Sequence, residues 1–408
     1  MNTTTGTSIP AHVPAHLVHD VDPYRLEGGA QDAHAAWKQV QQATPDIYYT
    51  PRYGGYWVLN RASLLSEVWP DHERFASSGA IAIPPMPPGL PLQAPIAIDP
   101  PEHHYFRHPI ALALSPRRIQ DYGVQARALA IELIEGFRAK GECDFVQDFA
   151  MHLPMTIFMH MVDLPMEDRA WLISRTEVMT RSGDPVQKGQ CYQEILGYLG
   201  KWIHQRREQP GTDLISEVLK IRVGDRPITD SEALGECSII LFGGLDTVAA
   251  TMGFCARFLA EHPEHRRQLI DDPSLIPAAV EELLRRHSIP MVSRRVTRDL
   301  ELGGVQMKAG DLVILETCLH SLDERAWPEP MKVDFQRRTQ DHMAFGKGIH
   351  KCPGANLARA ELRIFIEEWL LRIPDFQIKP GEAPVTANGA VMGMIRLPLV
   401  WNVEEFAL

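Results

Sequence analysis

An apolar run that ends near Leu259 constrains the fold more than any other part of this chain. The run follows Thr229-Asp-Ser-Glu232, a capping box in which the two outer side chains close off a helix start. Pro263 stops it, so the pattern predicts a helix of about 30 residues that spans roughly 45 Å. Because this helix is apolar almost all round, we expect it to run through the centre of the molecule.

The middle of the predicted helix has an unusual composition, with Gly243, Gly244, Asp246 and Thr247 in close succession. Two glycines cost around 2 kcal/mol of helix propensity relative to alanine. An aspartate is also unfavourable in a buried helix. The segment is either a packing notch where another helix crosses or a local opening of the helix beside a ligand.

A second constraint is the stretch Phe345-Gly-Lys-Gly-Ile-His-Lys-Cys-Pro-Gly354. Gly346 and Gly348 allow a tight turn. Pro353 suits the first position of the helix that we expect to continue through Trp369. Cys352 therefore stands at a helix N-terminus, where free N–H groups and the helix dipole favour a thiolate. Such a cysteine is either a buried structural residue or a ligand for a soft metal centre.

The full pattern F-G-x-G-x-H-x-C-x-G resembles the haem-ligand loop of the cytochrome P450 family, and G-G-x-D-T resembles the segment over the distal face of the haem. The resemblance extends over essentially the entire chain. It is closest to the camphor-hydroxylating branch among the soluble bacterial members. It implies a mainly α fold with small β-sheets, in which residues 1–408 form one domain with an irregular segment at 1–30. The implied cofactor is haem b, held between the long central helix and the cysteine loop, with Cys352 as its axial thiolate.

The same resemblance gives roles to individual residues. It implies that Thr247 steadies bound dioxygen, that Asp246 helps to deliver protons and that Arg181 gates Asp246. It also places further residues at the haem, which are His103, Arg107, Arg294 and His350 at the propionates together with Phe345, Gly346 and Gly243. The family's E-x-x-R motif corresponds to Glu282 and Arg285, and Arg337 is its expected third member in a structural ion cluster.

The residues around His103 leave other interpretations open. His103 and Arg107 share one helix face, which fits a solvated surface as well as a propionate site. His104 and His108 share another face and form a candidate metal pair, but no third ligand is near them in the sequence.

The implied reaction inserts one oxygen atom of dioxygen into an unactivated C–H bond. In the camphor branch a tyrosine anchors the substrate, but its position here is Pro91 and no tyrosine is nearby. We therefore expect a small hydrophobic terpenoid or norisoprenoid held by shape rather than camphor. The expected walls of the substrate pocket are Phe242, Ile239, Ile96, Met291, Val292 and Val391. Gln93 is the one polar candidate in the proline-rich loop from Ala80 to Pro95 that should roof the pocket.

Composition limits the partners and the compartment. The net charge of −11 argues against nucleic-acid binding. The start of the chain has neither a signal-peptide pattern nor a membrane anchor. The six cysteines are scattered, so we expect reduced thiols in a cytoplasm. We also expect a monomer.

No flavin or nicotinamide motif is evident, so electrons should come from a [2Fe-2S] ferredoxin with its NAD(P)H-dependent reductase. Lys347, Lys351, Arg107, Arg117 and Arg118 are candidates for a basic docking patch, although scattered solvated side chains fit the sequence equally well.

Two other functions fit the haem loop. A peroxygenase driven by hydrogen peroxide would not need the Asp246–Thr247 pair, and a non-enzymatic haem sensor would need a signalling module that is not visible. Within the monooxygenase reading, Pro353 lacks an N–H to bond the sulfur, so we expect stronger thiolate donation.

Periodicity predicts several other elements. Helices are expected at Ala33–Gln42, at Ala62–Trp69, from a capping Asp99, over most of Ile119–Leu172 and at Tyr192–Glu208. Hairpins or short strands are expected around Gly54-Gly55, at Arg222–Pro227, at Leu300–Met307 and at Asp311–Leu315, with an extended segment at Ser288–Arg298.

Overall fold

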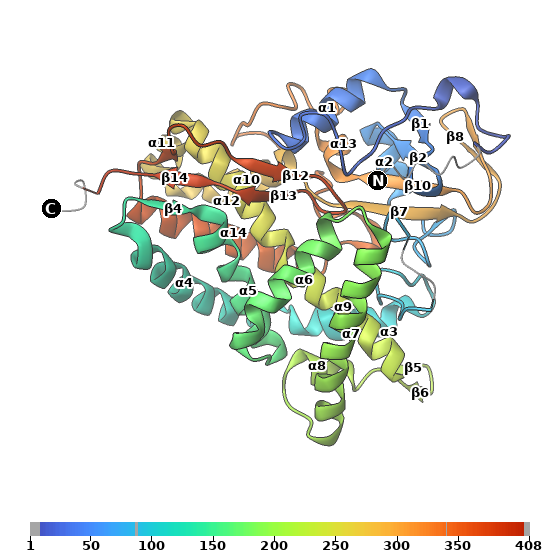
Figure 1. Ribbon diagram of the computed structural model, residues 1–408, viewed down its shortest axis with the longest axis horizontal. Helices are drawn as coiled ribbons and strands as arrows, with labels where there is room; N and C mark the ends of the chain where they lie inside the picture. Colours follow the sequence, from blue (N-terminus) through green and yellow to red (C-terminus); the bar gives the residue numbers. More distant parts are fainter. Residues whose placement is uncertain (1–8, 86–88, 340, 404–408) are drawn as a thin grey trace.

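The computed structural model describes residues 9–85, 89–339 and 341–403 (Figure 1). The α-helices are α1 (Ala33–Ala43), α2 (Ala62–Val68), α3 (His103–Ala113), α4 (Pro116–Arg138), α5 (His152–Val162), α6 (Arg169–Arg181), α7 (Pro185–Glu208), α8 (Leu214–Val218), α9 (Asp230–Leu245), α10 (Thr247–Glu261), α11 (Pro263–Asp271), α12 (Ile276–Arg286), α13 (Thr317–Ser321) and α14 (Ala355–Arg372). The strands are β1 (Ile47–Thr50), β2 (Tyr56–Leu59), β3 (Phe75–Ala76), β4 (Glu142–Asp144), β5 (Arg222–Val223), β6 (Arg226–Pro227), β7 (Met291–Val296), β8 (Leu300–Leu302), β9 (Val305–Met307), β10 (Leu312–Glu316), β11 (Gln377–Ile378), β12 (Val385–Ala387), β13 (Gly393–Arg396) and β14 (Pro398–Val400). The predicted class, mainly α with small sheets, is confirmed.

The long apolar run forms α9 and α10, which follow one another through the middle of the molecule (Figure 1). The predicted capping box opens α9. The Thr229 hydroxyl accepts the N–H of Glu232, and the Glu232 carboxylate accepts the N–H of Thr229. By length and composition the span Asp230–Glu261 would suit a membrane, but 71% of its most apolar window is buried inside the protein. Burial of that extent is what the core helix of a globular protein shows.

Small sheets flank the helices. The largest sheet has the order β1-β2-β10-β7-β3, with β2 and β10 parallel and the other pairs antiparallel. A second sheet has the order β11-β14-β4, and three two-stranded ribbons complete the set among the described residues. The expected strand over Leu300–Met307 is the ribbon β8–β9, which turns at Gly303 and Gly304, both with positive φ.

The hydrophobic core has two parts. One lies between α4, α10, α12, α14 and the five-stranded sheet, and its centre includes Trp369, whose ring meets Phe145 at 4.9 Å. The other lies between α5, α6, α7, α8 and α9 and contains Tyr192 and Phe242. α10 contributes to the first part and α9 to the second, so the segment between the two helices connects the two parts of the core.

Two predicted features are wrong. Asp99 does not cap α3, because its carboxylate accepts the N–H groups of Ser77 and Ser78 and α3 begins only after Glu102. α7 begins at Pro185 rather than at Tyr192, because the Asp184 side chain caps it. One of the breaks in the mostly helical segment Ile119–Leu172 is the short strand β4, which pairs with β14 from far along the chain.

Candidate functional site

The cysteine loop precedes α14 and is shaped by its glycines. Gly346 has φ +65° and Gly348 has φ +69°, a conformation that glycine adopts without strain. A Cβ at Gly346 would lie 2.5 Å from Trp69 Nε1, and a Cβ at Gly348 would lie 2.8 Å from Pro70 Cα. The loop closes where the Cys352 N–H donates to the Phe345 carbonyl at 2.8 Å. Both glycines are therefore needed for the loop to fit against α2.

Cys352 is exposed, whereas the other five cysteines are buried. The residue has free surface, but protein surrounds its thiol closely enough for desolvation to raise the pKa of that thiol. The N–H groups of Gly354 and Ala355, together with the positive charges of Arg107 and Arg359, act in the opposite direction and favour the thiolate. Pro353 has no N–H to offer, but the next two residues supply theirs. These four groups reduce the effect of desolvation without reversing it, and a bound cation would stabilise the thiolate further.

Arg359 is a site residue that sequence reasoning missed. Its guanidinium lies 4.6 Å from the centre of the Phe345 ring and pairs with Glu281 through two hydrogen bonds. The partly buried Phe345 ring is thereby fixed beside the cysteine loop. Arg359 is seven residues after Cys352, in the helix that follows it, and this spacing was the available sequence signal.

A cluster of cationic side chains lies next to this loop. His350 Nε2 is 3.4 Å from Asp99 Oδ1, and the His103 and His350 rings are 4.8 Å apart. Arg107 donates to the carbonyl of Lys351. Arg294 on β7 is 2% exposed and donates to the neighbouring Ser293 carbonyl. The structure thus brings the four predicted propionate residues together beside the cysteine loop, with Asp99 acting on His350, His103 and Arg294 and with Arg107 acting on His103.

This cluster has unused hydrogen-bonding capacity. His103 Nε2 is buried and has no partner among the described atoms. Burial and the neighbouring His350 and Arg107 lower the pKa of His103 to about 4, and burial lowers the pKa of Arg294 to about 10. Buried donors of this kind require an anionic partner. The two propionates of a haem would supply it, so the residues present fit that cofactor.

The central helix is interrupted where its composition predicted. α9 ends at Leu245 and α10 begins at Thr247, with Asp246 at φ −108° between them. The Thr247 hydroxyl donates to the Gly243 carbonyl at 2.9 Å. A Cβ at Gly243 would have no described atom within 4 Å, whereas a Cβ at Gly244 would lie 2.4 Å from Phe158 of α5. Gly244 therefore forms a packing notch, and Gly243 faces space that no described atom fills. A ligand beside this opening stays a prediction.

Asp246, the residue expected to deliver protons, is 5% exposed, which agrees with a carboxylate held inside the protein. Its expected gate is Arg181, the last residue of α6. The side chain of Arg181 lies outside the described part of the structure, so its role as a gate remains a prediction.

The E-x-x-R residues form a buried ion cluster. Arg285 donates to both oxygens of Glu282, at 2.7 and 2.9 Å, and Arg337 donates to Glu282 at 3.1 Å. Glu282 and Arg285 are fully buried. Arg285 also donates to three main-chain carbonyls from the segment between α13 and the cysteine loop. The cluster therefore holds that segment against α12.

The predicted pocket walls come from three places. Phe242 packs on Tyr192 of α7, with ring centres 6.1 Å apart, and Ile239 lies one turn before it on α9. The Met291 N–H donates to the Ala390 carbonyl, and Pro290 bridges Val391, so β7 and the Val391 turn are adjacent. The roles of these residues, and those of Ile96 and Val292, as substrate contacts stay predictions.

The roof loop has polar partners that the sequence did not reveal. The Tyr192 hydroxyl is 2.9 Å from Ser238 Oγ and donates to the carbonyl of Pro91 at 3.3 Å. Gln93 hydrogen-bonds the same hydroxyl. Tyr192 lies 101 residues after Pro91. No local pattern could therefore have linked them.

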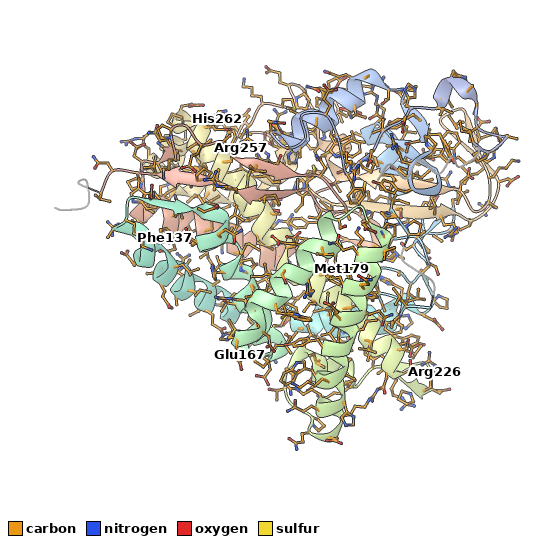
Figure 2. All side chains as sticks on the ribbon, in the orientation of Figure 1. Phe137, Glu167, Met179, Arg226, Arg257 and His262 are labelled. Atoms are coloured by element: carbon orange, nitrogen blue, oxygen red, sulfur yellow. The ribbon has the colours of Figure 1, made fainter. Side chains whose placement is uncertain are left out.

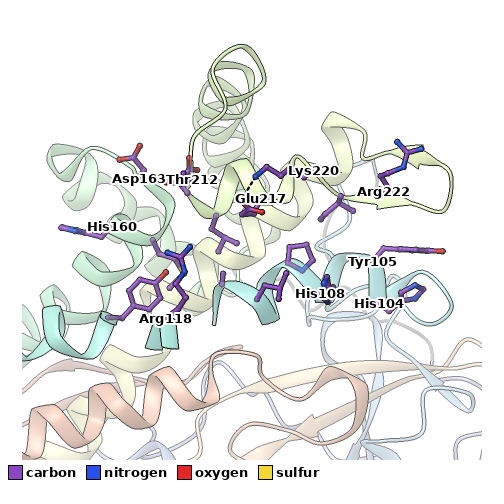
Figure 3. A pocket seen from close by; sticks show the side chains of 18 of the residues that line it. His104, Tyr105, His108, Arg118, His160, Asp163, Thr212, Glu217, Lys220 and Arg222 are labelled. Atoms are coloured by element: carbon purple, nitrogen blue, oxygen red, sulfur yellow. Dashed lines mark hydrogen bonds and ion pairs between the residues drawn. The ribbon is translucent and has the colours of Figure 1, made fainter. Parts of the chain in front are cut away.

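The His104–His108 pair lines a groove between α3, α5 and α8 rather than a metal site (Figure 3). His104 contacts the Pro101 carbonyl and stacks on Tyr105 at 3.9 Å. Nowhere in residues 9–85, 89–339 and 341–403 do three or more metal-binding side chains converge. The metal interpretation of this pair has no support.

Residues 186–401, more than half of the chain, match the family model described as Cytochrome P450. The chain belongs to the cytochrome P450 family. It is 33% identical to the probable cytochrome P450 127A1 of Sinorhizobium fredii over 96% of this chain and 97% of that protein. It is 31% identical to the nocardicin C N-oxygenase of Nocardia uniformis subsp. tsuyamanensis, over 91% and 96% of the two chains.

Solved P450 structures show the same fold. The crystal structure of CYP101C1 superposes with a TM-score of 0.86 at 40% identity, covering 97% of this chain and 100% of that one. The structure of CYP101J2 gives a TM-score of 0.86 at 37% identity with the same coverage. The predicted family and fold are confirmed, and the protein is a cytochrome P450 monooxygenase whose cofactor is a haem with a cysteine thiolate ligand.

Proposed function

We propose that Cys352 ligates the haem iron and that this P450 hydroxylates a small, mainly hydrocarbon terpenoid or norisoprenoid in the cytoplasm. One atom of dioxygen enters a C–H bond of the substrate. Two protons and two electrons, supplied by a [2Fe-2S] ferredoxin and its NAD(P)H-dependent reductase, reduce the other atom to water. The observation that carries this proposal is Cys352 itself, an exposed residue at the end of the glycine loop, beside the positive charge of Arg107 and directly before α14.

The chain's own residues have distinct tasks in this reaction. When bound, the thiolate-ligated haem supplies the activation of dioxygen. His103, Arg107, Arg294 and His350 bind and orient its two carboxylates. Thr247 Oγ1 holds a proton at the opening of the central helix, and the buried carboxyl of Asp246 passes protons toward it.

The substrate class follows from the roof. Its polar groups are occupied with one another, since Tyr192 bonds Ser238, Gln93 and the Pro91 carbonyl. The loop from Ala80 to Pro95 contains no charged residue. An apolar substrate would therefore leave no buried polar group of the roof without a partner, whereas a ketone would have to compete for the Tyr192 hydroxyl.

Replacing Thr247 by alanine should uncouple oxygen use from hydroxylation. We expect most reducing equivalents to appear as hydrogen peroxide and product per electron to fall by about tenfold or more, because the proton-holding hydroxyl is lost. The ratio of product to NAD(P)H consumed measures this.

Thr251→Ala is the matched control for Thr247→Ala. Thr251 makes the same type of bond one turn later, from its hydroxyl to the Thr247 carbonyl at 2.9 Å. The ratio of product to NAD(P)H consumed in Thr251→Ala should stay close to that of the wild type. Equal uncoupling in both variants would show a general effect on α10 and would contradict the role of Thr247.

Charge reversal at Lys351 should slow electron delivery. Lys351 is exposed next to Cys352, and Arg107 reaches its carbonyl. We expect the ferredoxin-dependent rate of Lys351→Glu at low salt to fall by about tenfold, because steering of an acidic partner is lost. Lys220→Glu, on an exposed side chain at the end of α8, should keep its rate. An unchanged rate in Lys351→Glu would contradict the proposal that Lys351 belongs to a docking patch for ferredoxin.

The substrate is best found by a spectral screen for compounds that convert the haem to high spin. A panel of terpenoids and norisoprenoids should contain binders, and product should form with ferredoxin, reductase and oxygen. Product from hydrogen peroxide alone would instead indicate a peroxygenase. A complete lack of product from compounds that do bind would favour a haem sensor.

A further inference from the structure

A cavity of about 290 Å³ lies at the end of α10 that is remote from Thr247. It is bounded by the start of α1, by α10 and α11, by the end of α12 and by the segment from Met331 to Val333. Figure 2 labels Arg257 and His262, which come from the last part of α10 and the residue after it. The volume is at the lower end of the range of about 300–1,000 Å³ that small-molecule sites occupy.

The walls of this cavity are rich in basic side chains. They include Arg257, Arg286, His34, His262, His265 and His287. Two acids are present as well, and both already have partners. Asp32 accepts the Ala35 N–H at the start of α1, at 2.9 Å, and Glu261 accepts from Arg257 Nε at 2.9 Å. The negative charge of Asp32 still acts on Arg286, His34 and Arg257, so it offsets part of the positive charge, but the basic side chains outnumber the two acids.

Arg286 and His287 are the two groups that lack partners. Arg286 is 8% exposed and donates its Nε to the Met331 carbonyl, but its Nη1 is buried without a partner among the described atoms. No ion pair joins Arg286 to an acid of the described residues, and Asp32 acts on it only through space. Both ring nitrogens of His287, which is 9% exposed, are likewise buried and unpartnered. Leaving a charged donor buried in this way is costly unless a counter-charge is supplied.

Packing holds the His287 ring in place. It stacks parallel to Phe254, with centres 5.9 Å apart and 5° between the planes, and the His34 ring meets it edge-on at 5.2 Å. His34 is itself oriented by a 2.9 Å contact with the Ser288 carbonyl. The donors are thus preorganised rather than free to turn toward solvent.

We infer that this cavity is a binding site for a small oxyanion, a phosphate or carboxylate group, held by Arg286 Nη1 and His287. A guanidinium binds such groups through charge-assisted hydrogen bonds, and an imidazole adds a neutral or charged donor. Burial and the positive charge of Arg286 hold the pKa of His287 well below its usual range. A bound anion would offset that positive field. The site is separate from the haem loop and independent of the proposed substrate.

Calorimetric titration of the haem-loaded protein tests the inference. Sodium phosphate and sodium succinate are the two probes, with sodium chloride at equal ionic strength as the reference. Saturable heat with either oxyanion, and none with chloride, is the expected result. Tighter binding of phosphate assigns the site to a phosphoryl group, and tighter binding of succinate assigns it to a carboxylate.

Variants locate the binding. In Arg286→Met the affinity for the oxyanion should fall by about tenfold or more, because one charge-assisted hydrogen bond is lost. His287→Phe keeps an aromatic ring against Phe254 and should also lower the affinity for the oxyanion. This second variant keeps the test valid should Arg286→Met fail to fold. Arg267→Met, at a 72% exposed side chain on the neighbouring α11, should bind as the wild type does. Equal binding in all variants, or saturation by neither oxyanion, would overturn the proposal.

Discussion

Replacing Cys352 by serine will abolish the strongly red-shifted Soret band that a thiolate-ligated haem shows when the protein is reduced and treated with carbon monoxide. The reason is that Cys352 is the proposed haem ligand. Desolvation raises the pKa of its thiol, the N–H groups of Gly354 and Ala355 and the charges of Arg107 and Arg359 oppose that shift, and a bound iron would stabilise the thiolate. A serine hydroxyl cannot donate charge to iron as a thiolate does. Monooxygenase activity should be lost with the band.

Cys318→Ser is the matched control for this substitution. Cys318 is fully buried on α13, and burial together with the neighbouring Glu316 raises the pKa of its thiol well above the usual value. A thiolate there would face Glu316, whose own pKa burial raises to about 8. The band should therefore persist in Cys318→Ser, with some loss of stability. A band that survives in Cys352→Ser but disappears in Cys318→Ser would reassign the ligand.

Much of this site could be predicted because glycine and proline have local consequences. Gly346 and Gly348 have positive φ in a loop where a side chain would clash with Trp69 or Pro70. The capping box at Thr229 is equally local, since its two hydrogen bonds join residues three apart. Features of this kind depend on neighbours in the sequence, so a sequence pattern can reveal them.

The features that sequence reasoning missed depend on residues that are distant in the sequence. Asp99 looked like a helix cap, but partners at Ser77, Ser78 and His350 compete for its carboxylate. The roof contact between Tyr192 and Pro91 joins segments that are 101 residues apart in the chain. Tertiary contacts therefore override a reasonable local signal wherever a charged or polar group has a better distant partner.

The two glycines inside the central helix lower its local helix propensity, and tertiary packing explains only one of them. Gly244 is explained by packing, because Phe158 occupies the space of its missing side chain. Gly243 has no such neighbour among the described atoms, and its carbonyl accepts the Thr247 hydroxyl. A residue that lowers helix propensity without a packing reason is the better indicator of function.

Removing Arg285 should destabilise the protein severely. Glu282 and Arg285 are both fully buried, and Arg285→Met would leave the Glu282 carboxylate with Arg337 and the N–H of Asp334. It would also remove the donor that Arg285 now provides to the carbonyls of Ser321 and Pro330, and one of the two donors to the Lys332 carbonyl. Breaking a buried pair in this way costs about 3–5 kcal/mol of unfolding free energy. Urea unfolding of the haem-loaded protein at fixed haem concentration measures it.

Two control variants should lose less stability than Arg285→Met. Arg337→Met should cost less than Arg285→Met, because the Arg337 side chain is 13% exposed and Arg285 would still neutralise Glu282. Lys220→Met breaks the Lys220–Glu217 pair, which has the same spacing of three residues as Glu282–Arg285 but lies at the surface, with side chains 59% and 45% exposed. It should cost about 0–1 kcal/mol, because water screens both charges in either state. If Lys220→Met and Arg285→Met lost equal stability, the buried cluster would not be what fixes the segment before the cysteine loop against α12.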